Sequence, residues 1–328
     1  MALPQSLSIA KFLALKIPYL DVRSEGEFTL GHIPHAQSMP LFNNIERAQV
    51  GTLYKQTSKE AAILKGFELV GPRLRAMAEQ GLAAAHDNRI GVYCWRGGMR
   101  SASVAWLLES LGLEVYTLKG GYKAYRNFAL AQFNEPRPLC VIGGKTGSRK
   151  TQLLGVLEKE GKNVIDLERL ANHRGSAFGY ADDYAQPTQE QFENDLAWVL
   201  FHLTPDETVF IEDESRLIGH VHIPDMLWSQ LRRAHVVVLN WPLEKRVEFL
   251  TREYHASSTV MEKNIEAIKK RLGGDRYKEA LALLAANDRA GVCRIMLDYY
   301  DRAYEYGLSK REQSTIRYVE GAEAFKIL

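Results

Sequence analysis

The sequence has few cysteines, no long apolar run and almost no net charge. Its three cysteines, Cys94, Cys140 and Cys293, are too far apart for a disulfide framework or a zinc motif, and this scarcity favours a reducing compartment. Lys11 and Lys16 interrupt the mildly apolar N-terminus, which is therefore a poor signal peptide. No apolar run approaches the length of a membrane span. These absences predict a cytoplasmic protein that does not enter a membrane.

The remaining composition is that of a folded protein with more than one core. The chain has 328 residues, of which 46% are hydrophobic and 25% charged, so it is too long for one typical core and unlike a disordered chain. The formal net charge is only +2. Bulk charge would therefore not attract nucleic acid, and an RNA partner would need a local basic patch.

The first part of the chain alternates strand-like and helix-like segments, which predicts a parallel sheet covered by helices. Strands are expected at residues 17–22, 36–39, 89–93 and 115–118, and helices at residues 25–30 and 101–111. A long polar and helical insertion at residues 43–71 interrupts this order. Insertions of that length in compact domains are more often functional than neutral.

A second α/β pattern follows residues 133–138, where Pro136 and Pro138 predict an extended linker. Strands are expected at residues 139–142, 163–165, 208–211 and 234–239, with helices at residues 150–160 and through most of 243–306. The sequence thus predicts one α/β domain at residues 12–135 and another at 136–328, the second with a helical C-terminal part.

The segment YCWRGGMRS at residues 93–101 is the most informative stretch. Cys94 lies between a predicted strand and a predicted helix, at the sheet edge where α/β proteins bind ligands. The residues around it that predict an anion cradle are Arg96, Gly97, Gly98 and Arg100. Such a cradle would favour the thiolate of Cys94, which is suited to sulfur or selenium transfer. The alternative is a structural cysteine, since free cysteine is among the most buried residues.

The segment GKTGSRKT at residues 144–151 almost matches the phosphate-binding Walker A pattern. In that pattern backbone N–H groups surround the phosphates, a lysine contacts them and a hydroxyl can hold Mg²⁺. The expected phosphate-binding residues are Gly144, Thr146, Gly147, Ser148, Arg149, Lys150 and Thr151. Arg149 stands where the pattern has its second glycine. Its side chain either distorts the loop or adds a contact to phosphate.

The segment VFIEDES at residues 209–215 resembles a Walker B strand that ends in acidic residues. Asp213 is placed to hold a metal-bound water or to act as a base. The alternative is that these acidic residues cap the next helix.

Two resemblances follow from these segments. The cysteine segment resembles the active-site loop of rhodanese-like sulfurtransferases, and LDVR at residues 20–23 with GHIP at residues 31–34 resembles their N-terminal signature. This resemblance implies that Asp21 and Arg23 buttress the cysteine loop. It also implies a rhodanese-like parallel sheet for the first domain, and the second domain is expected to be P-loop NTPase-like.

The whole chain resembles the bacterial tRNA 2-selenouridine synthase family. The segments that carry this resemblance are residues 43–71, 93–101, 118–125, 143–151 and 210–219. The family resemblance implies that a geranyl group from geranyl diphosphate is attached to the sulfur of wobble 2-thiouridine in tRNA. Selenium from selenophosphate then replaces the S-geranyl group.

The same resemblance assigns Cys94 to the selenium step and the loop at residues 144–151 to a phosphate-bearing substrate. It implies no covalent cofactor and no resident metal site, with Mg²⁺ as a candidate ion at the phosphates. The enzyme that supplies selenophosphate is a candidate partner beside tRNA.

The RNA partner has modest support from the residues themselves. Basic residues and tyrosines enrich the helical C-terminal part: Lys245, Arg246, Arg252, Lys269, Lys270, Arg271, Arg276 and Lys278, with Tyr254, Tyr277, Tyr299, Tyr300 and Tyr304. Such residues can contact phosphates and stack on bases. The alternative is a solvated charged face and a tyrosine stripe that belongs to the core.

Two other functions fit part of the pattern. A rhodanese-type sulfurtransferase with a regulatory nucleotide-binding module would turn over thiosulfate or a persulfide without RNA. A kinase-like enzyme with an inactive rhodanese half would transfer phosphoryl groups after loss of Cys94.

Overall fold

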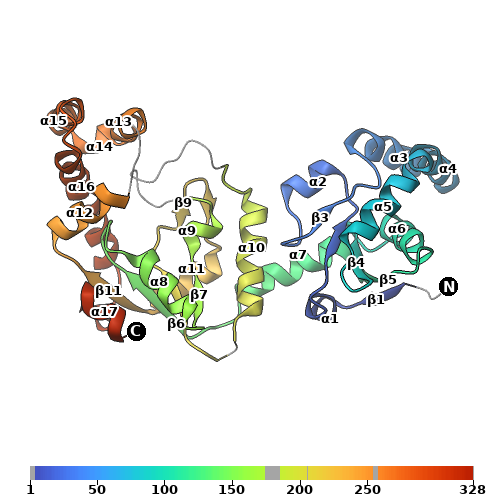
Figure 1. The fold of residues 1–328 in the computed structure, drawn as a ribbon, viewed down its shortest axis with the longest axis horizontal. Coiled ribbons are helices and arrows are strands. Elements are labelled where there is room, and N and C mark those ends of the chain that lie inside the picture. The colour runs from blue at the N-terminus through green and yellow to red at the C-terminus, as the bar shows by residue number, and fades with distance from the viewer. Residues whose placement is uncertain (1–3, 174–184, 205, 254–257, 328) are drawn as a thin grey trace. The chain divides into compact units, whose positions relative to one another are not determined.

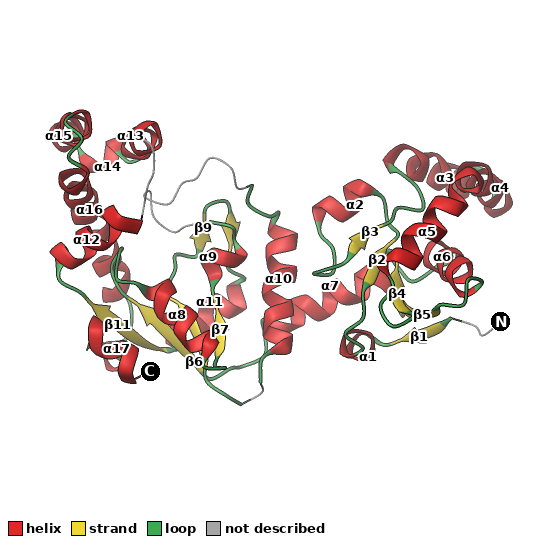
Figure 2. Ribbon diagram, viewed as in Figure 1, coloured by secondary structure: helices red, strands yellow, loops and turns green. Residues whose placement is uncertain are grey.

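Two compact units make up the chain in the computed structural model, which describes residues 4–173, 185–204, 206–253 and 258–327. The first unit comprises Met1–Gln132 with Glu193–Trp198, and the second comprises Phe133–Phe192 with Val199–Leu328. Each contains a five-stranded sheet whose strands are all parallel (Figures 1 and 2). Every helix within the described residues is too short or too polar to cross a lipid bilayer.

The sheet of the first unit has the strand order β1-β5-β4-β2-β3. Its strands are β1 (Gln5–Leu7), β2 (Tyr19–Asp21), β3 (Gln37–Ser38), β4 (Arg89–Tyr93) and β5 (Glu114–Leu118). Its helices are α1 (Ile9–Ala14), α2 (Glu25–Leu30), α3 (Asn44–Gln56), α4 (Lys59–Val70), α5 (Leu74–Ala84), α6 (Met99–Glu109) and α7 (Gly121–Gln132). Ile90 and Val92 of the central strand β4 are fully buried, as expected for a parallel strand that is covered on both faces.

The predicted insertion forms a helical hairpin, α3 and α4. Asn43 and Glu46 make a capping box at the start of α3, where the Asn43 side chain accepts from the Glu46 N–H at 2.9 Å. Ser58 caps α4 by accepting from the Ala61 N–H at 3.0 Å. Local sequence therefore determines where both helices begin.

The sheet of the second unit has the strand order β12-β11-β6-β8-β7, and β9 and β10 form a separate antiparallel pair. The strands are β6 (Leu139–Gly143), β7 (Asn163–Ile165), β8 (Val209–Glu212), β9 (Leu217–Ile218), β10 (Val221–His222), β11 (His235–Asn240) and β12 (Ile316–Glu320). The helices are α8 (Lys150–Lys159), α9 (Leu167–Leu170), α10 (Gln189–His202), α11 (Asp225–Arg233), α12 (Leu243–Glu253), α13 (Ser258–Ala267), α14 (Lys269–Leu272), α15 (Gly274–Ala285), α16 (Arg289–Ser309) and α17 (Gly321–Ile327).

Helices α12 to α16 build an apolar core of their own, which includes Leu250, Ile265 and Leu297. The chain then returns to the sheet, where β12 pairs with β11. The predicted fold class is confirmed: two parallel α/β sheets, the second followed by a helical C-terminal part. The sequence did not predict the edge strands β1 and β12.

Candidate functional site

Cys94 directly follows β4, and its thiol lies on the floor of the loop that leads into α6. The Gly98 N–H donates to Cys94 Sγ at 3.3 Å, and Ser101 Oγ lies 3.2 Å from the same sulfur. Only 2% of Cys94 is exposed, while residues 95–98 of the loop are exposed. The loop therefore presents backbone and cationic groups to solvent directly above the sulfur.

A second segment, at the start of α7, holds the shape of the cysteine loop. The Tyr122 N–H donates to the Cys94 carbonyl at 2.8 Å. Gly121 has a φ of +61°, and a Cβ there would lie 2.2 Å from the Cys94 carbonyl oxygen. Only glycine fits such a conformation and approach without strain. This contact explains the LKGGYKAY segment, whose role the sequence alone did not indicate.

The two arginines of the predicted cradle have different surroundings. Arg96 is exposed, whereas Arg100 Nη1 donates to Glu27 Oε2 at 2.9 Å. Arg47 Nε lies 3.7 Å from the same carboxylate oxygen. Although partial burial opposes it, the contacts with Arg100 and Arg47 lower the pKa of Glu27 below its ordinary value. Arg100 therefore shares its charge with Glu27, and Arg96 is the more available cation of the loop.

Asp21 and Arg23 form a buried ion pair beneath this loop. Arg23 Nη2 lies 2.6 Å from Asp21 Oδ2 and donates to the Gly31 carbonyl at 2.6 Å. Its guanidinium also lies 3.7 Å from the centroid of the Tyr122 ring. Because Tyr122 holds the Cys94 carbonyl, the geometry supports the buttressing role that the family resemblance implies.

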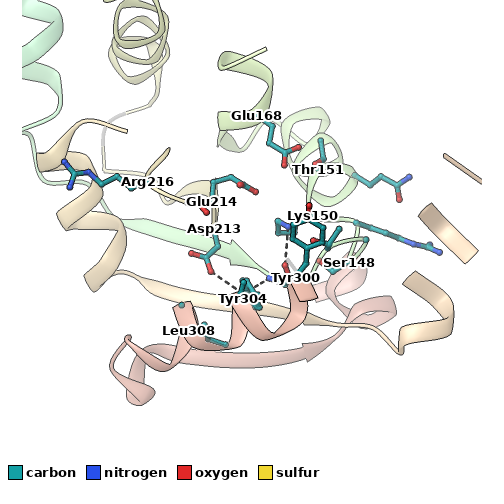
Figure 3. Close-up of a pocket in the computed structure, with 18 of the residues that line it drawn as sticks. Ser148, Lys150, Thr151, Glu168, Asp213, Glu214, Arg216, Tyr300, Tyr304 and Leu308 are labelled. Carbon is teal, nitrogen blue, oxygen red and sulfur yellow. Dashed lines mark hydrogen bonds between the residues drawn. The ribbon is translucent and has the colours of Figure 1, made fainter. Parts of the chain in front are cut away.

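In the second unit, the phosphate loop connects β6 to α8 and borders a cavity of about 810 Å³. Figure 3 shows Lys150 and Thr151 close together on one side of it, with Asp213 and Glu214 across from them. Lys150 Nζ donates to the Gly144 carbonyl at 3.2 Å. The Ser148 hydroxyl is buried and has no hydrogen-bond partner among the described residues. A buried polar atom of this kind calls for a ligand or water.

Four carboxylates set the electrostatics around Lys150: Glu168, Glu212, Asp213 and Glu214. Burial raises the pKa of Glu212 to about 8, and burial likewise raises the pKa of Glu214 well above its ordinary value. Although burial opposes it, the charges of Glu214, Glu168 and Glu212 raise the pKa of Lys150. Lys150 thus remains a cation in this pocket, as a phosphate-binding lysine must.

Glu212, rather than Asp213, is the acidic residue that contacts the phosphate loop. Thr151 Oγ1 donates to Glu212 Oε1 at 3.1 Å. Asp213 instead accepts from Arg311 Nη2 at 2.6 Å and from the Tyr304 hydroxyl at 3.2 Å. The role of Asp213 as a base or as a holder of a metal-bound water stays a prediction. Sequence reasoning missed Glu212, although it ends the same strand.

Arg149 has a left-handed backbone, with φ of +65° and ψ of +29°. Such a conformation costs a non-glycine residue about 1–2 kcal/mol. The Arg149 guanidinium lies 4.5 Å from the Trp241 ring centroid and 5.0 Å from that of Phe249. Cation–π contacts of this kind stabilise by about 0.5–2 kcal/mol, so they offset the backbone cost. Arg149 also borders the cavity, and its contact with phosphate stays a prediction.

Helices of the C-terminal part hold the phosphate loop in place. The Gly144 N–H donates to the Tyr304 hydroxyl at 2.7 Å. Arg246 donates to Asp301 Oδ2 at 2.6 Å and to the Thr146 carbonyl at 3.2 Å. Tyr304 and Arg246 belong to the set of residues that could contact RNA or could instead be structural, and Arg246 is buried in this ion pair, as the structural alternative expects. Tyr304 is partly buried against the loop.

Comparisons with known proteins match both halves of the chain. A model described as the tRNA 2-selenouridine synthase AAA domain matches residues 137–327, and a model of the rhodanese-like domain matches residues 10–128. A tRNA 2-selenouridine synthase from Sulfurovum sp. (strain NBC37-1) is 36% identical and covers 94% of this chain and 93% of its own. One from Psychromonas ingrahamii is 33% identical and covers 94% and 92%.

The chain belongs to the tRNA 2-selenouridine synthase family. Among solved structures, an N-terminal domain from Clostridium difficile 630 is 50% identical over 38% of this chain and 99% of its own, with a TM-score of 0.37. Membership of the family confirms that the protein is an enzyme of selenium transfer and tRNA modification.

Several other candidates for RNA contact pair with residues of the C-terminal helices. Arg276 pairs with Asp298, and Lys269 lies 2.9 Å from Glu266. Arg271 Nη1 donates to the Tyr299 hydroxyl at 3.1 Å. Tyr254 lies outside the described residues. Exposed ion pairs are weak, so these side chains could exchange their present partners for RNA phosphates. Contact with RNA therefore stays a hypothesis for them.

Loss of the Asp21 carboxylate should destabilise the first unit. Asp21→Asn leaves the buried Arg23 without its opposite charge, which lowers the free energy of unfolding by about 3–5 kcal/mol. Urea denaturation followed by circular dichroism measures this change. Glu79→Gln is the control, because it breaks an ion pair with Arg75 that is exposed on both sides and should change stability by less than about 1 kcal/mol. Equal effects of the two variants would contradict the buttressing role.

Proposed function

We propose that this protein converts 2-thiouridine at the wobble position of tRNA to 2-selenouridine in two steps. In the first step the sulfur attacks the geranyl group of geranyl diphosphate, diphosphate leaves with the electron pair of the broken C–O bond, and the uridine loses its N3 proton. In the second step the selenium of selenophosphate attacks C2 of the S-geranylated base, geranylthiolate leaves with the electron pair of the broken C–S bond, and water cleaves the P–Se bond to release phosphate. The observation that carries this proposal is the presence of two loops for anions, each at the carboxyl edge of its own parallel sheet.

The cysteine loop serves the selenium step in this proposal. The exposed Arg96 would bind the phosphate oxygens of selenophosphate. Cys94 lies under that position, with its sulfur 3.3 Å from the Gly98 nitrogen. Loop and thiol together would hold the selenium donor for its attack on the S-geranylated base.

The phosphate loop serves geranyl transfer by binding the diphosphate. Lys150 supplies the cation, and the loop supplies its backbone N–H groups. Ser148 supplies a buried hydroxyl that has no other partner among the described residues. No three histidine, cysteine, aspartate or glutamate side chains of the described residues are arranged to hold a metal. Mg²⁺ would be held mainly by the substrate phosphates, with the hydroxyl of Thr151, which lines the cavity, as a protein oxygen ligand. Bound there, it would neutralise the departing diphosphate.

The function as a whole is tested in a strain that lacks the gene. Mass spectrometry of its tRNA nucleosides should show 2-thiouridine without 2-selenouridine, and the restored gene should return 2-selenouridine. Normal 2-selenouridine in the deletion strain would overturn the proposal. Turnover of thiosulfate by the purified protein without RNA, with no change of tRNA, would instead favour a sulfurtransferase.

Cys94→Ala should abolish 2-selenouridine and leave S-geranylated tRNA behind, because the first step does not use the thiol. The measurement is mass spectrometry of nucleosides from cells that carry the variant. Cys140→Ala is the matched control, since Cys140 lies on β6 outside both loops, and it should keep 2-selenouridine at the wild-type level. Normal selenation by Cys94→Ala would remove this assignment.

Lys150→Ala should stop the reaction one step earlier, at 2-thiouridine, because the diphosphate loses its main cation. The purified variant is given geranyl diphosphate and 2-thiouridine-containing tRNA, and S-geranyl nucleoside is quantified. A loss of roughly ten- to a hundredfold is expected, since a charge-assisted contact of about 1.5–3 kcal/mol is removed. If Lys150→Ala and Cys94→Ala accumulate the same nucleoside, the two loops do not divide the steps.

Arg149→Gly separates a phosphate contact from backbone strain. If Arg149 pairs with a diphosphate oxygen, the variant should bind geranyl diphosphate roughly tenfold more weakly, as each 1.4 kcal/mol is tenfold. Isothermal titration measures this, and a thermal melt reports the relief of strain. Arg169→Ala is the control, because Arg169 pairs with Glu158 on the surface. Unchanged or tighter binding by Arg149→Gly would assign Arg149 to loop structure alone.

A further inference from the structure

The first unit contains an apolar cleft that neither loop uses. The cleft has a volume of about 1300 Å³ and is bordered by α3, α4, α5 and α6. Figure 1 shows these four helices next to one another. Five large hydrophobic side chains line it although each is between 39% and 69% exposed: Tyr54, Phe67, Leu74, Met99 and Trp106. A surface that exposes so many large apolar side chains in one place is typical of a ligand or partner site.

The lining of the cleft includes the two residues that come directly after the cysteine loop. Met99 and Arg100 line the cleft, and they follow directly after Gly98, whose N–H donates to Cys94 Sγ. A ligand in the cleft would therefore extend from the region of the reactive sulfur along the outer face of α6. The cleft is thus placed to bind a substrate of the cysteine loop.

The lining of the cleft suits an apolar chain attached to an anion. Its interior includes the buried side chains of Phe42, Val70, Met77 and Val104. Arg47, Lys55 and Arg100 are the charged residues that border it; Arg47 and Arg100 also contact Glu27, so Lys55 is the cation that does not share that carboxylate. An apolar wall with cationic residues at its border complements a hydrocarbon group carried by a polyphosphate backbone.

We infer that this cleft binds the ten-carbon geranyl chain of S-geranylated tRNA while selenium replaces the sulfur at the cysteine loop. The inference rests on the proposed function, which supplies an S-geranyl substrate for this loop. It gives the α3–α4 insertion a role, because its two helices form one side of the cleft. It also gives the geranyl group a use: burial of the chain anchors the uridine beside Cys94.

The test compares two RNA stem-loops, one with S-geranyl-2-thiouridine and one with 2-thiouridine at the wobble position. The full-length wild type should bind the geranylated RNA at least about tenfold more tightly, because the chain is removed from water. Phe67→Asp should abolish this preference. Trp106→Ser, which changes the part of the lining on α6, should also reduce it. The ratio of the two affinities is the readout, since general damage to the fold weakens both RNAs alike.

Leu64→Asp is the matched control. Leu64 lies on the same helix and is 67% exposed, close to the 69% of Phe67, but it does not line the cleft. It should keep the wild-type ratio. An equal ratio in Phe67→Asp and Leu64→Asp, or a wild type without preference, would overturn the inference. A wild-type dimer that Phe67→Asp converts to a monomer, with the ratio unchanged, would also overturn it by assigning the cleft to contact between copies.

A separate assay distinguishes failure of the proposed function from failure of the inference about the cleft. The wild type is given the geranylated stem-loop and selenophosphate, and 2-selenouridine is quantified. If no 2-selenouridine forms, the proposed two-step function fails whatever the binding ratio. If it forms and the ratio is insensitive to Phe67→Asp, only the inference about the cleft fails.

Discussion

In both units, the candidate site depends on the way a parallel sheet ends. All strands of such a sheet finish at one edge, and the turn into the next helix directs backbone N–H groups toward whatever binds there. Cys94 follows β4 at such an edge, and the phosphate loop follows β6. Much of the remaining structure serves to hold these turns: Tyr122 and Gly121 support the first, and Tyr304 and Arg246 the second.

Buried charge is handled differently in the two units. Asp21 and Arg23 neutralise each other, and the remaining guanidinium contacts are with the Gly31 carbonyl and an aromatic ring. Around Lys150 the carboxylates outnumber the cation, and burial raises the pKa values of Glu212 and Glu214. A closed pair of charges gives rigidity. An unbalanced cluster responds to protons, cations and phosphates, which suits a site where charged substrates arrive and leave.

Helical additions shape the candidate site of each sheet. The α3–α4 hairpin supplies one wall of the apolar cleft beside the cysteine loop. In the second unit, α12 and α16 carry the residues that hold the phosphate loop. The same physical need underlies both cases, because loops that bind anions have few apolar contacts of their own and must be fixed by neighbouring elements.

The sequence by itself determined the two parallel sheets, the two loops and the helical insertion, because these depend on local periodicity, glycine spacing and capping residues. It did not indicate β1 or β12, which are edge strands that form by pairing with β5 and β11 far along the chain. Only the tertiary structure decided that Glu212, not its neighbour Asp213, meets Thr151, since one residue at a strand end reverses the direction of a side chain. It likewise brought Tyr304 to Gly144 across 160 residues, a contact that depends on packing and has no local signal in the sequence.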